Sequence, residues 1–409
     1  MKNNSDDYVT QVLDSVLDAD PRAWNELLAQ QHAPSPFMRH EYLAALERSG
    51  SATRATGWTP RVLTLTRGGE LQAACAIYLK KHSYGEYVFD WAWANAYQQH
   101  GLAYYPKAVI AVPFTPVPGA RLLARDASAR QALLTAVLGW CEKQKLSSLH
   151  LLFAADEDVA ACEHAGLMLR HTVQFHWTNQ SAGVGTSETT RRYADFEAFL
   201  AGLAHEKRKK IRQERRKVAQ AGVTFRWSAG NEIRASDWDL FYRCYERTYL
   251  EHGNAPYLTP EFFAAMARDL PQHWLLFVAE RGASPIAASL IALSEPPGAG
   301  PGEAAGQRAA KVAYGRYWGA LERVDCLHFE ACYYQPLQWC IAHGFDRFEG
   351  GAQGEHKMAR ALMPVKTHSA HWLAHPAFAD AVERFLEREG EGIENYLEHL
   401  EERSPFRRA

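Results

Sequence analysis

Two stretches of this chain match one another, VLTLTRGGELQAACAIYL at Val62–Leu79 and LFVAERGASPIAASLIAL at Leu276–Leu293. Each contains two runs of apolar and β-branched residues, separated by Arg-Gly and a short turn. Runs of this kind around a glycine turn predict a β-hairpin. The chain therefore carries the same hairpin twice, once in each half.

Two further blocks match across the halves and lie in the same order. PFMRHEYLAAL at Pro36–Leu46 corresponds to PYLTPEFFAAM at Pro256–Met266, and Tyr84–Tyr87 (YGEY) corresponds to Tyr314–Tyr317 (YGRY). Three collinear blocks indicate a tandem duplication. Strands and helices alternate around them, which predicts an α/β fold with mixed sheets.

The remaining elements are expected from apolar periodicity. In the first half these are strands at Lys107–Val112, Ser148–Phe153 and Leu167–Trp177 and helices at Ser128–Lys145 and Asp156–Ala165. In the second half they are strands at Cys326–Glu330 and Phe345–Glu349 and helices at Tyr333–His343 and Ala377–Leu400.

A length of 409 residues suits two domains rather than one. The polar, glycine-containing stretch NQSAGVGTSETT at Asn179–Thr190 has the composition of a linker. We therefore expect an N-terminal domain over residues 1–182 and a C-terminal domain over residues 183–409.

Composition narrows the class of protein. The net charge of −2 does not steer the whole molecule toward nucleic acid or anionic lipid, so a polyanion site has to be local. The start lacks the basic and apolar regions of a signal peptide, and no apolar run is long enough to span a membrane, so we expect a cytoplasmic protein. The seven cysteines are scattered without a C-x-x-C pair, so neither a disulfide framework nor a metal site is expected.

A basic helix is predicted over Phe196–Ala221, with HEKRKKIRQERRK at its centre. Eight cations so close together repel one another unless an anion offsets them, which favours contact with phosphates. The candidate phosphate-binding residues are Lys207, Arg208, Lys209, Lys210 and Arg212. A solvated charged face is the alternative.

Residues able to do chemistry concentrate in EGGAQGEHKMAR at Glu349–Arg360 and THSAHW at Thr367–Trp372. The first stretch follows a predicted strand and contains Gly350, Gly351 and Gly354, whose backbone can approach a ligand closely. The ends of strands are where open α/β sheets place their sites. We therefore expect the active site here.

Acyl transfer to an amine needs a base, donors for the oxyanion and a surface that orients the substrates. Candidates for the base are His356, Glu355 and Glu349, while Gln353 and neighbouring backbone amides are candidate oxyanion donors. The candidate substrate-binding residues are Lys357, Arg360, Glu330, Tyr333, Tyr334, His368 and His371. An ordinary solvated turn and packing of His371 with Trp372 are the alternatives. A metal held by His368, His371 and His375 is disfavoured, because H-E-x-x-H is absent.

Three stretches carry a resemblance to a known family. They are HEKRKKIRQERRK (205–217), ERTYLEHGNAPYLTPEFF (246–263) and HFEACYYQPLQWCIAHGFDRFEGGAQGEHKMARALMPVKTHSAHW (328–372). Together they resemble the bacterial Fem-like family of the GNAT (N-acetyltransferase) superfamily, often labelled peptidoglycan biosynthesis/recognition. The resemblance implies tandem acetyltransferase-like domains that transfer an acyl or aminoacyl group to an amine, with a cell-wall precursor as the acceptor.

The donor implied by the resemblance is acetyl-CoA or another acyl-CoA, or an aminoacyl-tRNA. The chain lacks the long coiled-coil insertion of the best-known Fem-type proteins, so both donors stay open. Two other functions also stay open: a non-catalytic module that recognises a ligand in the same groove, and a protein that binds tRNA or another nucleic acid through residues 205–217.

Overall fold

The structure is a computed structural model that describes residues 8–180, 192–295, 310–352 and 354–407. It divides into two compact units. Unit 1 comprises Met1–Thr172, Tyr257–Phe262 and Lys366–Asn395, and unit 2 comprises Val173–Pro256, Phe263–Val365 and Tyr396–Ala409. This division differs from the expected cut at residue 182, because a segment near the end of the chain returns to unit 1.

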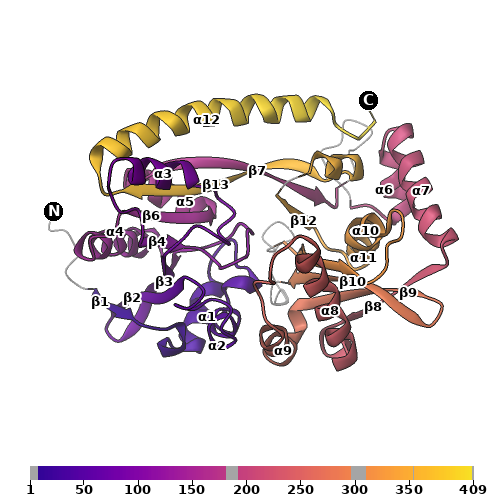
Figure 1. Ribbon diagram of the computed structural model, residues 1–409, viewed down its shortest axis with the longest axis horizontal. Helices are drawn as coiled ribbons and strands as arrows, with labels where there is room; N and C mark the ends of the chain where they lie inside the picture. The colour runs from indigo at the N-terminus through magenta and orange to yellow at the C-terminus, as the bar shows by residue number, and fades with distance from the viewer. Residues whose placement is uncertain (1–7, 181–191, 296–309, 353, 408–409) are drawn as a thin grey trace, which may run out of the picture. The chain divides into compact units, whose positions relative to one another are not determined.

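Figure 1 labels most of the helices and strands along the chain. From the N-terminus to α5 they are β1 (Val9–Leu13), α1 (Pro21–Ala29), α2 (His40–Arg48), β2 (Trp58–Arg67), β3 (Glu70–Lys80), α3 (Trp91–Gln99), β4 (Lys107–Ile110), β5 (Leu123–Ala124), α4 (Ala127–Lys143), β6 (Ser148–Ala154) and α5 (Asp156–His164). Short 3-10 turns at Val16–Asp18 and Pro36–Met38 complete this part.

The chain continues with β7 (Met168–Thr178), α6 (Phe196–Gly202), α7 (His205–Gln220), β8 (Val223–Ala229), α8 (Ala235–Glu251), α9 (Pro260–Asp269), β9 (Trp274–Arg281), β10 (Ser284–Ser294) and β11 (Val312–Ala320). The last elements are α10 (Leu327–Phe329), a π-helical turn (Glu330–Tyr334), α11 (Gln335–Ala342), β12 (Arg347–Ala352), a 3-10 turn η7 (Glu355–Arg360), β13 (Met363–Leu373) and α12 (Pro376–Glu402). Two more 3-10 turns lie at Gly230–Glu232 and Pro271–His273.

The two units have sheets of the same design. Unit 1 has the strand order β1-β2-β3-β4-β6-β13 and unit 2 the order β8-β9-β10-β11-β12-β7. In each sheet only one neighbouring pair is parallel, β4 with β6 and β11 with β12. The matching sequence blocks Val62–Leu79 and Leu276–Leu293 form the equivalent hairpins β2/β3 and β9/β10. The α/β class with mixed sheets is therefore confirmed.

The last strand of each sheet comes from the other half of the sequence. In unit 1, β6 pairs with residues of β13, with His371 opposite His150. In unit 2, β12 pairs with residues of β7, with Phe348 opposite Trp177. The linker expected at 179–190 lies largely outside the described residues.

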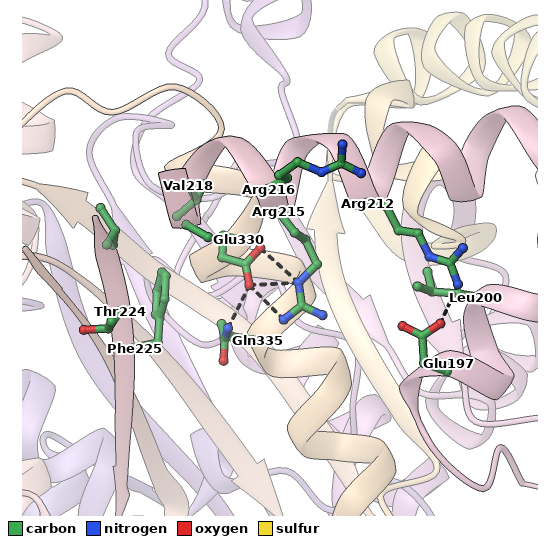
Figure 2. Close-up of a pocket in the computed structure, with 12 residues that line it drawn as sticks. Glu197, Leu200, Arg212, Arg215, Arg216, Val218, Thr224, Phe225, Glu330 and Gln335 are labelled. Atoms are coloured by element: carbon green, nitrogen blue, oxygen red, sulfur yellow. Dashed lines mark hydrogen bonds and ion pairs between the residues drawn. The ribbon is translucent and has the colours of Figure 1, made fainter. Parts of the chain in front are cut away.

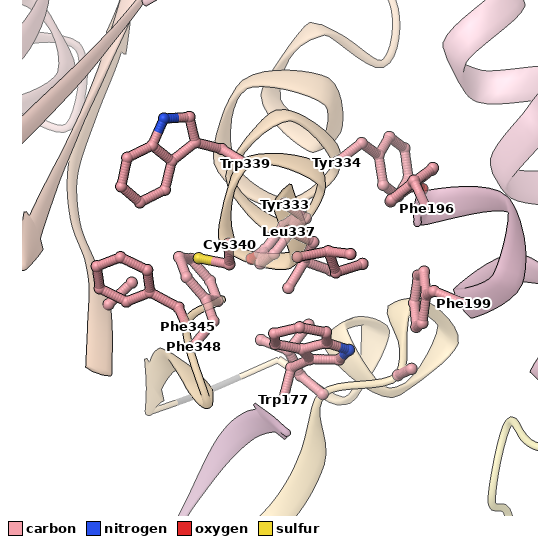
Figure 3. Packing of buried hydrophobic residues seen from close by; sticks show 14 of the residues in the cluster. Trp177, Phe196, Phe199, Tyr333, Tyr334, Leu337, Trp339, Cys340, Phe345 and Phe348 are labelled. Atoms are coloured by element: carbon pink, nitrogen blue, oxygen red, sulfur yellow. The ribbon is translucent and has the colours of Figure 1, made fainter. Parts of the chain in front are cut away.

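The core of unit 2 is strongly aromatic, and its cluster of buried side chains is drawn in Figure 3. It joins the sheet to α6 and α11 through Trp177, Phe199, Leu337 and Phe348. The main core of unit 1 is aliphatic, with α4 packed on β2, β3, β4 and β6. These cores hold the strand ends that carry the polar side chains described below.

Two sequence predictions of local structure are wrong. Cys326–Glu330 is helical rather than a strand, because it forms the start of a helix that runs on into α11. The basic helix is broken at Leu203, which is extended and bridges Phe406.

Candidate functional site

A cavity of about 310 Å³ lies in unit 2, where the parallel strands β11 and β12 separate. Its lining residues come from β10, β11, β12, the helical segment that begins at Leu327, and η7. They are Ser289, Ile291, Gly315, Arg316, Tyr317, Trp318, His328, Cys332, Tyr333, Phe348, Gly350, His356 and Lys357.

The cavity exists because the ladder between the two parallel strands stops. Their register runs from Val312 opposite Arg347 to Tyr314 opposite Glu349, and the next residue, Gly315, already lines the cavity. A Cβ at Gly315 would lie 2.9 Å from the ring of Phe348, so a side chain there would fill the space. The YGRY motif thus marks the point where the sheet opens.

A β-bulge lies at the same point. Leu290 of β10 is opposite Tyr317, and the next residue, Ile291, is opposite Gly315, which leaves Arg316 as the extra residue of β11. A bulge interrupts the regular ladder and bends the strand locally. Arg316 is one of the residues that line the cavity.

The wall opposite the strands is a π-helical turn, Glu330–Tyr334, placed directly before Pro336. Proline in a helix interior removes one hydrogen bond and crowds the carbonyl four residues back, and a wide π turn accommodates both effects. The turn gives consecutive side chains different surroundings. Tyr333 lines the cavity, whereas the hydroxyl of Tyr334 donates a hydrogen bond to Glu214 of α7.

The cavity contains two imidazoles, each with a lowered pKa. The side chain of His356 is exposed, and its Nε2 lies 3.5 Å from the hydroxyl of Tyr333. Partial desolvation, with the charges of Arg360 and Lys357, lowers the pKa of His356 below its usual range. His328, whose ring lies 5.7 Å from that of Tyr333, has a pKa lowered to about 4, mainly by burial. A neutral imidazole can accept a proton.

Lys357 lines the cavity and also holds the backbone of Gly350 and Gly351 in place. Its Nζ donates hydrogen bonds to the carbonyl oxygens of Gly350, at 2.7 Å, and Gly351, at 3.2 Å. Burial lowers its pKa to about 8. Gly350 is closely packed, since a Cβ there would lie 2.3 Å from the side chain of Leu362.

Two of the expected catalytic carboxylates are not among the residues that line the cavity. Side chains alternate along a strand, and Phe348 and Gly350 line the cavity while Glu349 between them lies on the other face. There Glu349 pairs with Arg347 at 2.9 Å, and burial raises its pKa to about 7. Glu355 is exposed and pairs with Arg403 at 2.7 Å. Gln353, the expected oxyanion donor, lies outside the described residues.

Arg360 is buried and holds the site together rather than facing it. Its guanidinium pairs with the carboxylate of Glu214 at 2.9 Å, donates to the carbonyl of His356 at 2.7 Å and stacks on the ring of Phe329. Because the carboxylate of Glu214 already offsets the charge of Arg360, nothing supports the expected role of Arg360 as an anion-binding residue.

The remaining candidates lie elsewhere. Glu330 faces α7, where it pairs with Arg215 at 3.1 Å. His368 and His371 belong to unit 1, where their Nδ1 atoms lie 2.9 Å from that of His171 and 2.7 Å from that of His150, respectively. His371 is buried.

The basic helix α7 buries Ile211, Glu214 and Val218 and exposes most of its cations. A groove of about 520 Å³ runs along it, and Figure 2 shows two arginines of this groove already paired, Arg215 with Glu330 and Arg212 with Glu197. The other cations make no ion pair with any residue that the structure describes. These are Lys207, Arg208, Lys209, Lys210, Arg216 and Lys217.

Sequence reasoning missed several residues of the cavity, among them Arg316, Trp318, His328 and Cys332. The repeated YGRY block was the available signal for this stretch, because it contains Arg316 and directly precedes Trp318. His328 and Cys332 gave no such signal, since their segment reads as a strand followed by a helix. Within the described part of the chain, no three His, Cys, Asp or Glu side chains group as a metal site requires.

Solved structures with a similar fold include two named proteins. The fold is that of FemX, with a TM-score of 0.52 at 10% identity over 91% of this chain and 100% of that one. It is also similar to the C-terminal domain of a putative lysylphosphatidylglycerol synthetase from Agrobacterium fabrum (TM-score 0.51, 10% identity, 90% of this chain and 96% of that one). At such identities the likeness shows the fold alone.

The chain belongs to the FemAB-like family, described as peptidoglycan biosynthesis/recognition, which matches residues 15–408. A search of curated proteins finds no match. None of the described helices is long and apolar enough to cross a bilayer.

Proposed function

We propose that the chain is a transferase that moves an acyl or aminoacyl group onto an amine in the cavity of unit 2. The observation that carries the proposal is the position of His356, whose Nε2 lies 3.5 Å from the hydroxyl of Tyr333 in a cavity at the end of the β11/β12 ladder. Acyl transfer to an amine needs a base, an acid and a group that stabilises the oxyanion, and His356, Tyr333 and Lys357 are our candidates for these roles.

In this reaction the amine nitrogen attacks the carbonyl carbon of the donor, and the carbonyl oxygen takes up negative charge. The charge of Lys357, which lines the cavity, stabilises that oxyanion. His356 takes the proton released by the amine. The C–N bond forms, the bond to the leaving group breaks, and the hydroxyl of Tyr333 gives the leaving group a proton. Burial raises the pKa of Tyr333, so it is protonated at neutral pH.

We propose that the donor carries phosphates and reaches the cavity across α7. The unpaired cations of α7 would contact those phosphates, and the π-helical turn links the two places, since Glu330 faces α7 while Tyr333 faces the cavity. Acyl-CoA and aminoacyl-tRNA both fit this chemistry. The family supports an amine of a peptidoglycan precursor as the acceptor, and the cytoplasmic location stays a prediction.

The test is a transfer assay by mass spectrometry with acyl-CoA or aminoacyl-tRNA as donor and cell-wall precursors as acceptors. We expect His356→Gln to lower kcat by about 100-fold or more, the contribution of a positioned base. Its melting temperature should stay within a few degrees, because the side chain of His356 is exposed. His164→Gln, an exposed histidine of α5, is the matched control.

Full activity of His356→Gln would remove this residue from the mechanism. Tight precursor binding without product would make the chain a recognition module instead. Nucleic-acid binding that is unaffected by Lys209→Glu and Lys210→Glu would exclude α7 as the phosphate contact.

A further inference from the structure

The segment Ser83–Trp91 of unit 1 has an inverted surface pattern. Its polar side chains Ser83, Glu86 and Asp90 are buried, whereas Tyr84 is 60%, Phe89 55% and Trp91 37% exposed. Surface segments normally place carboxylates in water and aromatic rings in the core. The reversal is specific to this segment, because the matching YGRY block of unit 2 lies within a strand.

A buried network holds the segment in this conformation. Lys107, which is fully buried, donates to Ser83 at 2.9 Å and to Glu86 at 2.7 Å and forms an ion pair with Asp90. Lys80 donates to the carbonyl of Tyr84 at 3.0 Å. Buried charges bring little net stability, because desolvation offsets their attraction.

The backbone is fixed at a second point as well. Arg170 donates to the carbonyl of Phe89 at 2.7 Å and is itself held by Glu389 at 2.7 Å. The exposed rings are therefore set in place before any partner arrives. Such preorganisation lowers the entropy lost on binding.

An apolar hollow begins where this segment ends. Trp91 opens α3, and the next residues, Ala92 and Trp93, line a hollow of about 470 Å³ between α3 and α12. The other lining residues are Ala96, His100, Leu102, His375, Ala377, Phe378, Ala381, Val382 and Phe385. No carboxylate, lysine or arginine is among the lining residues that the structure describes.

We propose that the Ser83–Trp91 segment and this hollow form a lipid-docking site. The exposed rings enter the interfacial layer of a bilayer, and one acyl chain of a phospholipid occupies the hollow. This site lies within unit 1 and is independent of the transfer reaction proposed for unit 2.

Charge, side-chain type and shape favour lipid over a protein partner. Between His82 and Pro106, all of which the structure describes, both charged side chains, Glu86 and Asp90, are buried. This segment thus offers no ion pair to a protein partner. Tyrosine and tryptophan are the residues enriched where protein meets the bilayer interface. A hollow, unlike a flat apolar face, accepts a flexible chain.

The test uses the full chain and vesicles of phosphatidylcholine, which carry no net charge, in a flotation assay. We expect the wild-type chain to float with the vesicles equally at low salt and at about 0.5 M salt, because the vesicles carry no net charge. Phe89→Ser and Trp91→Ser should each lower the partition coefficient about tenfold, the contribution of one buried ring. Trp227→Ser, which removes a ring that is 46% exposed on β8 of unit 2, should not change it.

A second variant tests the hollow separately. Ala381→Trp fills the hollow from α12 and should weaken binding of monomeric short-chain phosphatidylcholine about tenfold while the rings stay in place. Wild-type chain that stays with the aqueous fraction, or ring variants that float as well as wild type, would overturn the proposal. So would a wild-type dimer that Phe89→Ser converts to monomer, since the rings would then face a second copy. Transfer to a water-soluble acceptor should be unchanged in Phe89→Ser, which separates this proposal from the function of unit 2.

Discussion

His356 and Lys357 are neighbours in the chain, and burial lowers the pKa of both. If His356 is the base, kcat/KM rises as it loses its proton and reaches its plateau at a lower pH than free imidazole would allow. Lys357 loses its charge near pH 8, so substrate binding that needs this cation should weaken above that value. A pH profile of kcat/KM should therefore show both limbs, and Lys357→Arg should move only the alkaline one. A profile in which His356→Gln keeps the acid limb would assign that limb to another group.

Glu349 should make stability depend on pH in the direction opposite to a salt-bridged carboxylate. Its pKa rises from the usual 4.5 to about 7 on folding, so the folded state holds this proton more tightly than the unfolded chain does. The stabilisation is fully present below about pH 4.5 and is lost as pH rises toward 7. Glu349→Gln should remove this loss, which is on the order of 3 kcal/mol.

The measurement is urea unfolding of both proteins at a series of pH values. Glu355→Gln, which changes an exposed carboxylate six residues away, should keep the wild-type slope. Parallel curves for wild type and Glu349→Gln would show that Glu349 is ionised in the folded protein throughout this range.

At the scale of elements, Glu214 joins α7 to the site. Its buried carboxylate pairs with Arg360 and accepts a hydrogen bond from Tyr334. Glu214→Ala would leave a buried guanidinium without its counter-charge, which costs about 3–5 kcal/mol. Urea unfolding should show this loss, whereas Glu206→Ala, an exposed glutamate on the same helix, should change stability by less than about 0.5 kcal/mol. An equal effect of both variants would mean that the pair contributes nothing specific.

The hairpins and most helices follow from local sequence pattern, because β2/β3, β9/β10 and α4 have regular apolar spacing and clear turns. The exceptions depend on partners that are distant in sequence. Leu203 interrupts the basic helix since Ala204 donates to the carbonyl of Pro405 and Leu203 bridges Phe406. The helix at Leu327–Tyr334 was not predicted, because its aromatic residues favour strands.

The candidate site was predictable only in part, because the orientation of its side chains also depends on partners that are distant in sequence. The tract Glu349–Arg360 does supply His356, Lys357 and Gly350 to the cavity. Strand alternation and the π turn decide which side chains point into the cavity. As a result, Glu349 and Tyr334 point away from the cavity. A sequence motif locates a segment but does not say which of its side chains share a face.

At the scale of the whole chain, unit 1 should not fold from residues 1–182 alone. It needs β13 to cover the edge of β6 and α12 to complete the small core of Trp93, Tyr97 and Leu386. We expect the fragment 1–182 to lack a cooperative thermal transition and to aggregate. Supplying residues 363–409 as a separate chain should restore solubility. A soluble 1–182 fragment with a sharp transition would show that the returning segment is dispensable.

Because β13 is synthesised long after β6, unit 1 cannot complete its sheet early in translation. Roughly two hundred residues of unit 2 have to leave the ribosome between the end of the first segment of unit 1 and its closing strand. At elongation rates of about 5–20 residues per second, about 10–40 seconds pass between the synthesis of β6 and that of β13. Nascent chains of this protein should therefore depend on chaperones during synthesis, and codon changes that slow translation of residues 173–365 should lower the yield of folded protein.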